Sequence, residues 1–464
     1  MGRKRAAVFD EEGTGVPRPR WAEETYLSRP RRVLLATRAL ALVTLAAVAM
    51  VATLLLLSTL LASAAAAPRS FPKQNNDCGD ALNPYPDGRR LTFNKDGTFK
   101  VVLFTDLHYG ERDGGNVWAE WGVEQDTNST RVMNYALDDE SPNLIVYGGD
   151  QITGENQLWE NSTVFLDEIF APALAHNTPF TTIYGNHDES YNISHVQSFW
   201  YEKTRAKAKK LSWTQMNDAS SDDPKGVFNY YIPVYAHDNA RVPALLLWFF
   251  DSRSGTFNSG YFNVTDEKWM SQDWVDPKAA TWINGTAAQM KEQWGSLPKS
   301  LVYVHIPPSP AQAIGNDTVA KDPEDHPGIN YDEPVDIQGQ NGAAFWGRNT
   351  PDKAFWNAVT GTLGGSDGSG LIAVTSGHDH GNDWCGRDDS VGPFTFCFGR
   401  HTGYGGYGNW ARGSRVWQAR LDTAGALGDL KSWIRMEDHS TANTTTLVQN
   451  GQTTLINSHD PAPK

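Results

Sequence analysis

Polar motifs at the ends of apolar runs are the residues of this sequence best suited to chemistry. The segment "TSGHDHGND", residues 375–383, places two histidines two positions apart directly after an apolar run. Because residues i and i+2 of an extended chain face the same side, the two imidazoles can converge on one point. Imidazole is a common metal ligand, so this spacing predicts a metal site whose other ligands come from elsewhere in the chain.

Four further apolar runs end in similar motifs, and the five motifs together offer carboxylate, amide and imidazole donors. This set has no thiolate and suits Fe, Mn or Zn. Seven donors are too many for one tetrahedral ion, but they match two ions about 3.5–4 Å apart that share a carboxylate. Each motif alone is also typical of a turn or a surface loop, so the ordered set carries the prediction. The donors are Asp106, His108, Asp150, Asn186, His305, His378 and His380.

Buried strands must position these motifs. The runs at 99–106, 143–150 and 179–188 are separated by stretches long enough for helices at 127–139 and 157–175, which indicates βαβ units with parallel strands. Several later strands follow one another without a helix between them, which favours a mixed sheet or a two-sheet sandwich. Ligands of open α/β sheets bind beyond the carboxyl ends of the strands, where the motifs fall. The later strands are predicted at 227–235, 243–251, 300–306, 370–376, 393–399 and 414–421.

The order D-x-H, G-D, G-N-H-D, a histidine after a strand, and G-H-x-H resembles the calcineurin-like metallophosphoesterase superfamily over residues 96–425. The segments "DLHYGE", "GDQITGEN" and "GHDHGND" resemble its purple-acid-phosphatase-like branch, which includes a phosphatase known as a dosage-dependent cell-cycle regulator. The resemblance implies an α/β (α+β) metallophosphoesterase fold, a four-layer αββα sandwich with mixed β-sheets. Purple enzymes carry a tyrosine three residues after the bridging aspartate, where this chain has Thr153, so no purple colour is expected.

The resemblance also implies roles for individual residues. His187 would donate a proton to the leaving group, and Asp188 would either orient His187 or stabilise a turn. Arg400 and His401 lie in a stretch rich in glycine and aromatic residues, where they would either contact phosphate or only pack. By resemblance, one metal ion is bound by Asp106, His108, Asp150 and His380, and the other by Asp150, Asn186, His305 and His378, with Asp150 as the bridge.

The favoured activity is hydrolysis of a phosphomonoester by metal-activated hydroxide, with a phosphorylated small molecule or a phosphoprotein as substrate. A phosphodiesterase or sphingomyelinase-like reaction stays open, because the same two-metal core serves both. A membrane-anchored binding protein without turnover is the alternative from another class. Nucleic acid is not expected as a partner, because the formal net charge is -14 and nucleic-acid binding needs dense positive charge.

The N-terminal region differs in composition from the rest of the chain. Residues 1–38 predict a disordered cytoplasmic tail, and residues 39–67 contain no charged residue over more than the ~20 positions that cross a bilayer. The arginines before this run favour a type II signal anchor, with a cleaved signal peptide as the alternative. Residues 68–95 predict a linker, and 426–464 a C-terminal extension with a loose tail from residue 440.

This organisation predicts a single-pass membrane protein whose phosphoesterase domain lies in the lumen of the ER, Golgi or vacuole or at the cell surface, or a secreted protein. Cys385 and Cys397 are close enough in sequence to form a disulfide that leaves Cys78 over, and three free thiols are the alternative. Glycosylation sequons fit the same compartment. They begin at Asn128, Asn161, Asn192, Asn263, Asn284, Asn316 and Asn443.

Overall fold

The computed structural model describes residues 82–111, 124–156, 159–190, 193–216, 228–253, 272–340, 351–365, 370–390, 392 and 394–458. All of them belong to one compact unit, Asn76–Lys464. The predicted signal anchor and Cys78 lie outside the described residues. Within these ranges, no helix is both long enough and apolar enough to cross a bilayer.

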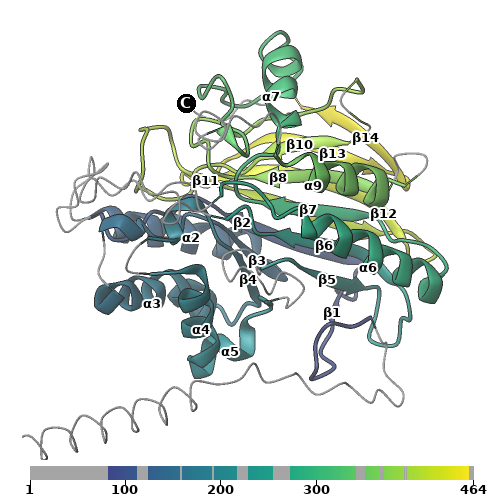
Figure 1. Ribbon diagram of the computed structural model, residues 1–464, viewed down its shortest axis with the longest axis horizontal. Coiled ribbons are helices and arrows are strands. Elements are labelled where there is room, and N and C mark those ends of the chain that lie inside the picture. The colour runs from purple at the N-terminus through teal and green to yellow at the C-terminus, as the bar shows by residue number, and fades with distance from the viewer. Residues whose placement is uncertain are drawn as a thin grey trace, which may run out of the picture. The chain divides into compact units, whose positions relative to one another are not determined.

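Two seven-stranded sheets form the centre of this unit (Figure 1). The first sheet has, in spatial order, β1 (Leu91–Thr92), β5 (Tyr230–Tyr235), β6 (Pro243–Phe250), β7 (Ser300–Val304), β8 (Leu371–Ser376), β10 (Thr395–Phe398) and β9 (Cys385–Gly386). The second has β14 (Gln452–Asn457), β13 (Thr441–Gln449), β12 (Leu427–Met436), β11 (Gly413–Leu421), β2 (Thr98–Phe104), β3 (Leu144–Gly148) and β4 (Phe180–Ile183). Both sheets are mixed, because parallel and antiparallel neighbours occur in each.

Apolar residues on both faces of the strands explain why the sheets stack. In β6, Leu245 and Leu247 belong to the core between the sheets, whereas Leu246 and Trp248 belong to the core on the outer face. Successive side chains of a strand point to opposite faces, so an unbroken apolar run specifies a strand that is covered on both sides.

Helices cover the two outer faces. Met133 and Ile169 pack on the second sheet, and Ile283 and Phe355 pack on the first. The layers therefore run helix, sheet, sheet, helix, and the predicted αββα sandwich is confirmed. The helices over the second sheet are α2 (Gln125–Glu140), α3 (Trp159–Ala175), α4 (His195–Thr204) and α5 (Ala206–Leu211). Those over the first are α6 (Lys278–Trp294), α7 (Pro310–Ile314), η6 (Gly315–Val319), α9 (Lys353–Ala358) and η7 (Val359–Leu363).

The C-terminal region differs from its prediction. The loose tail expected from residue 440 is wrong over its described part, because β13 and β14 extend the second sheet to Asn457. Their threonines and valines suit strands, and Leu447 and Val448 of β13 are buried in the core between the sheets. The described part of the predicted C-terminal extension therefore completes the sandwich. At the other end, the last residues of the predicted linker form β1, which pairs with β5.

Cys385 and Cys397 are directly opposite each other on β9 and β10 and form a disulfide with an S–S distance of 2.06 Å.

The sequons fall in different environments. Asn284 and Asn316 are exposed, and Asn128 is half-buried on α2. Asn443 is a correction, since its side chain is buried and its Nδ2 donates to Asp383 Oδ2 at 3.2 Å. A glycan on Asn443 is incompatible with this packing. The side chain of Asn161, and all of Asn192 and Asn263, lie outside the described residues.

Candidate metal centre

The seven predicted donors meet at the carboxyl ends of strands from both sheets. Three follow β2 and β3, one follows β4, and three follow β7 and β8. Among the described residues, three groups have their candidate ligand atoms within 4.8 Å of one another, and two of these groups consist of predicted donors. The first group is Asp106, His108 and His380, and the second is Asp150, His305 and His378.

In the first group, two imidazole nitrogens face each other without a proton between them. His380 Nδ1 lies 3.0 Å from the Tyr407 carbonyl, so this nitrogen is the donor. His108 Nδ1 lies 2.9 Å from the hydroxyl of Thr153, which itself donates to a carboxylate and therefore accepts from His108. Both Nε2 atoms then present lone pairs to each other at 3.2 Å.

Burial lowers the pKa of His108 to about 3 and the pKa of His380 well below its ordinary value, so a proton does not resolve this contact. A metal cation does, because neutral imidazole is the form that binds metals. Asp106 Oδ1 completes the group at 3.8 Å from His380 Nε2.

The second group gathers acceptor atoms around His305. Its Nδ1 donates to the Gly148 carbonyl at 2.9 Å, and its Nε2 faces Asp150 Oδ2 at 3.0 Å and Asn186 Oδ1 at 3.2 Å. Burial lowers the pKa of His305, but the charges of Asp150 and Asp106 outweigh burial and raise it to about 9. A site this negative holds a cation on Nε2, either a proton or a metal ion.

His378 and the bridging position join the two groups. His378 Nδ1 lies 2.9 Å from Asn186 Oδ1, and burial lowers the pKa of His378 to about 3, which keeps it neutral. Asp150 Oδ2 lies 3.0 Å from His305 Nε2 and 3.7 Å from His108 Nε2, so one carboxylate oxygen faces both groups. This donor chemistry fits two metal ions that share Asp150.

Four of these residues have left-handed backbone conformations, which cost a non-glycine residue about 1–2 kcal/mol each. Such conformations persist where the surrounding fold fixes them, and they cluster at functional sites. The four are Asp106 (φ 56°), His108 (φ 50°), Asp150 (φ 49°) and His378 (φ 76°).

Glycines in the motifs allow the close approach of the ligands. A Cβ on Gly149 would lie 2.3 Å from His305 Nδ1, and one on Gly185 would lie 2.2 Å from Asp150 Oδ1. Neither contact is possible, so both positions require glycine.

His187 lies beside the first group. Its backbone N–H donates to Asp150 Oδ1 at 2.8 Å, and its ring centroid is 5.0 Å from that of His108. The side chain is half-buried, so it borders both the metal ligands and the solvent. This position is open to a leaving group bound at the centre.

Asp188 stabilises the turn that carries Asn186 and His187. One oxygen accepts the N–H groups of Gln151 and Ile152 at 2.8 and 3.1 Å, and the other accepts the Gly185 N–H at 2.8 Å. Of the two roles predicted for Asp188, orienting His187 or stabilising a turn, these bonds match the second.

Arg400 is a correction to the predicted substrate contacts. It is fully buried, with Nη1 2.8 Å from Asp383 Oδ2 and with Nε and Nη2 donating to the Ala411 carbonyl. An arginine held in this way is part of the core. His401 is also buried, and its ring packs on that of His380 with centroids 4.0 Å apart. It therefore contacts a predicted metal ligand, and its burial leaves no surface for a substrate.

Two buried groups near the centre were not predicted. Glu111 bonds to Thr153, which contacts His108. His195 Nε2 lies 2.9 Å from the Gly185 carbonyl, under the turn that carries Asn186. Glu111 falls within the quoted motif "DLHYGE", which is the one available signal for it, whereas His195 lies on α4 outside every motif.

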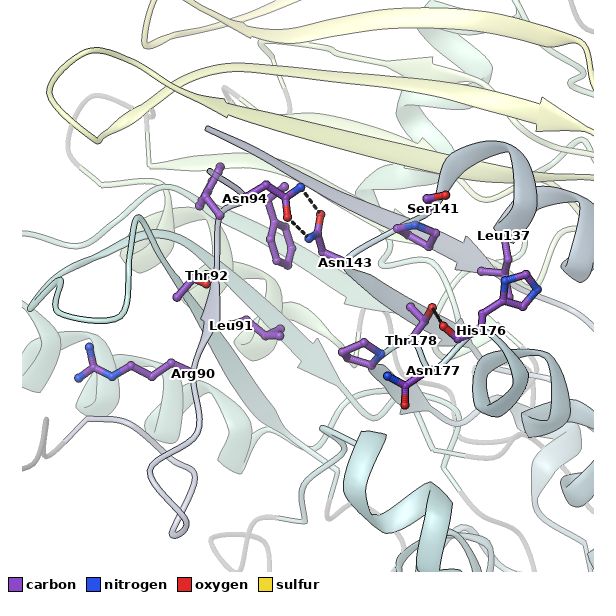
Figure 2. A pocket seen from close by; sticks show the side chains of 14 residues that line it. Arg90, Leu91, Thr92, Asn94, Leu137, Ser141, Asn143, His176, Asn177 and Thr178 are labelled. Carbon is purple, nitrogen blue, oxygen red and sulfur yellow. Dashed lines mark hydrogen bonds between the residues drawn. The ribbon is translucent and has the colours of Figure 1, made fainter. Parts of the chain in front are cut away.

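A cavity of about 500 Å³ lies elsewhere, at the amino ends of β2, β3 and β4 (Figure 2). Asn94 and Asn143 pair through their amides in its lining, which also includes His176. It contains no convergent set of acidic and imidazole groups, so the carboxyl edge of the strands is the better candidate for chemistry.

The fold is that of the metallophosphoesterases, and the two His/Asp groups at the strand ends are consistent with a dinuclear metal centre. The chain belongs to the calcineurin-like phosphoesterase family, which matches residues 99–382. The resemblance drawn from the motifs is confirmed.

Individual relatives are purple-acid-phosphatase-like. The chain is 28% identical over 382 residues to an Arabidopsis thaliana protein named probable inactive purple acid phosphatase 14, covering 77% of this chain and 85% of that protein. It is 27% identical over 322 residues to phosphatase DCR2 of Saccharomyces cerevisiae, covering 67% of this chain and 49% of that one. A dimetal phosphatase from Danio rerio aligns in structure with a TM-score of 0.45 and 14% identity, over 75% of this chain and 98% of that one.

Proposed function

We propose that the chain is a metal-dependent phosphomonoesterase, an acid phosphatase or phosphoprotein phosphatase. The observation that carries the proposal is the convergence of seven donors with Asp150 between the two groups. Two ions of Fe, Mn or Zn at this centre would supply a deprotonated water and neutralise charge on the phosphoryl oxygens.

The chain's own residues supply the remaining steps. Asp150 fixes the backbone of His187 through its hydrogen bond to the His187 N–H, so the proposed acid is held next to the bridging ligand. The imidazole of His187 faces solvent on one side and can donate a proton to the departing alkoxide. A leaving alkoxide in water needs such a proton, and general acids typically contribute about 10²–10⁴-fold in rate.

A comparison of monoester and diester hydrolysis tests the proposal. Wild-type chain should hydrolyse p-nitrophenyl phosphate faster than bis-p-nitrophenyl phosphate, and His187→Ala should lower kcat by about 10²-fold or more with metal content unchanged. His176→Ala is the matched control, because His176 is half-buried at the opposite edge of the sheet. A preference for the diester would favour the phosphodiesterase alternative. Full activity of His187→Ala would remove the acid role.

A metal-binding protein without turnover is the second candidate, because several relatives are named probable inactive purple acid phosphatases. All seven ligand positions are retained here, which supports catalysis. Full metal content with no hydrolysis of either ester would favour the binding protein.

For location, we propose a single-pass type II membrane protein with this domain on the lumenal or extracellular side. The uncharged run at 39–67 and the arginines before it support this orientation. Protease protection in sealed vesicles tests it, since the domain should resist digestion until detergent is added.

A further inference from the structure

Glu111 is a buried carboxylate whose hydrogen bonds lead to both histidines of the first metal group. Its Oε1 accepts the Thr153 hydroxyl at 2.6 Å, and its Oε2 accepts Gln125 Nε2 at 2.8 Å and the Gly406 N–H at 2.9 Å. The side chain is completely buried.

The bond to Thr153 sets the proton position on His108. A threonine hydroxyl has one proton, and here that proton points to Glu111, so the oxygen is free to accept. His108 Nδ1 lies 2.9 Å from this oxygen and must donate to it. The proton is then on Nδ1, and Nε2 keeps the lone pair that a metal requires.

The bond to Gly406 fixes the loop behind the other histidine. Gly406 packs so closely on His380 that a Cβ there would lie 2.2 Å from His380 Cε1. The next residue, Tyr407, stacks on His380 with ring centroids 4.0 Å apart, and its carbonyl accepts from His380 Nδ1. The Gly406 N–H bond to Glu111 ties this loop to the Thr153 side of the group.

We infer that Glu111, acting through Thr153 and the Gly406–Tyr407 loop, is the positioning residue that holds His108 and His380 in the tautomer and orientation needed for metal binding. The inference rests on the proposed function and deepens it at one of the two metal positions. It also gives a role to Thr153, where purple enzymes carry a tyrosine. Here the hydroxyl serves as an acceptor for a ligand instead of as a ligand itself.

Three substitutions separate the hydrogen bonds from the packing. Thr153→Val keeps the shape and removes the hydroxyl, whereas Thr153→Ser keeps the hydroxyl. Glu111→Gln is nearly isosteric but has one acceptor oxygen. With that oxygen toward Gln125 and Gly406, the new amide donates to Thr153, which must then donate to His108 Nδ1 and move the imidazole proton to Nε2.

Metal binding by the full-length chain is the direct test. Metal content and dissociation constants for Mn²⁺ and Zn²⁺ are measured at pH 8, because burial raises the pKa of Glu111 to about 7 and the argument concerns its ionised form. In Thr153→Val and in Glu111→Gln, the affinity for one of the two expected metal ions should fall about 10–100-fold. Thr153→Ser should bind both ions as wild type does. Thr395→Val is the control, since Thr395 is buried on β10 and its hydroxyl has no hydrogen-bond partner among the described residues.

The outcomes distinguish the inference from the proposed function. Wild-type binding of about two ions, with Thr153→Val and Glu111→Gln unchanged, would overturn the inference and leave the proposed function intact. A wild-type chain that binds no metal after Mn, Fe and Zn are supplied would overturn both. If circular dichroism shows that Thr153→Val does not fold, the test uses Glu111→Gln and Thr153→Ser, which both keep a polar side chain. Weaker metal binding by Glu111→Gln alone would support the inference, and equal binding by the two variants would overturn it.

Discussion

Substitution of Arg400 separates a structural role from the substrate contact that its sequence position suggested. Arg400 and Asp383 are both fully buried and form an ion pair at 2.8 Å. Arg400→Met removes the cation and leaves the Asp383 carboxylate in the core, and breaking a buried pair from one side costs about 3–5 kcal/mol. The two donors to the Ala411 carbonyl are lost as well. The free energy of unfolding should therefore fall by at least about 3 kcal/mol.

Urea unfolding measures this loss, with metal concentration held fixed because bound metal also stabilises the fold. The double variant Arg400→Met/Asp383→Asn should be less destabilised than the sum of the two single variants, since it leaves no unpaired charge. The KM for p-nitrophenyl phosphate should stay within about twofold of wild type, because a buried arginine contributes no binding energy to a substrate. An unchanged unfolding free energy with a tenfold higher KM would refute the reasoning and restore the substrate contact.

Three further perturbations test other parts of the structure. Gly185→Ala should abolish hydrolysis and lower metal content, because its Cβ would lie 2.2 Å from Asp150 Oδ1; normal activity would contradict the geometry. Burial lowers the pKa of His195, but the neighbouring carboxylates of Asp251, Glu189 and Asp188 raise it to about 9, so its stabilisation is complete below pH ~6.5 and is lost as pH rises through ~9. Wild type should lose about 3 kcal/mol of unfolding free energy over this range, and His195→Gln should show a flatter profile. Replacing Cys385 and Cys397 by alanine should cost about 2–4 kcal/mol, measured by urea unfolding under non-reducing conditions.

Most strands were predictable because they are short apolar runs with a polar motif at the end. β6 and β8 match their predicted ranges to within a residue at each end, since both faces of these strands are buried and their sequences are largely apolar. β13 was missed because its run of threonines resembles a polar tail until the neighbouring strands β12 and β14 pair with its two edges. Pairing partners far apart in the chain are not visible in local composition.

In the metal centre, too, features with a local sequence signal were predicted, and features that depend on distant partners were not. Each ligand follows a strand, and Asp150, Asn186 and His378 come directly after a glycine, so their positions are local signals. The sequence left phosphate contact and packing both open for Arg400, because its partner in the core, Asp383, lies seventeen residues earlier and no motif links the two. The role of Glu111 depends on hydrogen bonds to Thr153 and Gly406, 42 and 295 residues away, which no spacing rule predicts.

The most direct test of the central claim is the metal content of the purified full-length chain, measured together with p-nitrophenyl phosphate hydrolysis on the same sample. The account predicts about two metal ions per chain, loss of hydrolysis on chelation, and recovery when metal is restored. Asp150→Asn, which removes the charge between the two groups, should lose both metal and hydrolysis. A folded chain that binds no Mn, Fe or Zn, or that hydrolyses the ester equally well after chelation, would contradict the account.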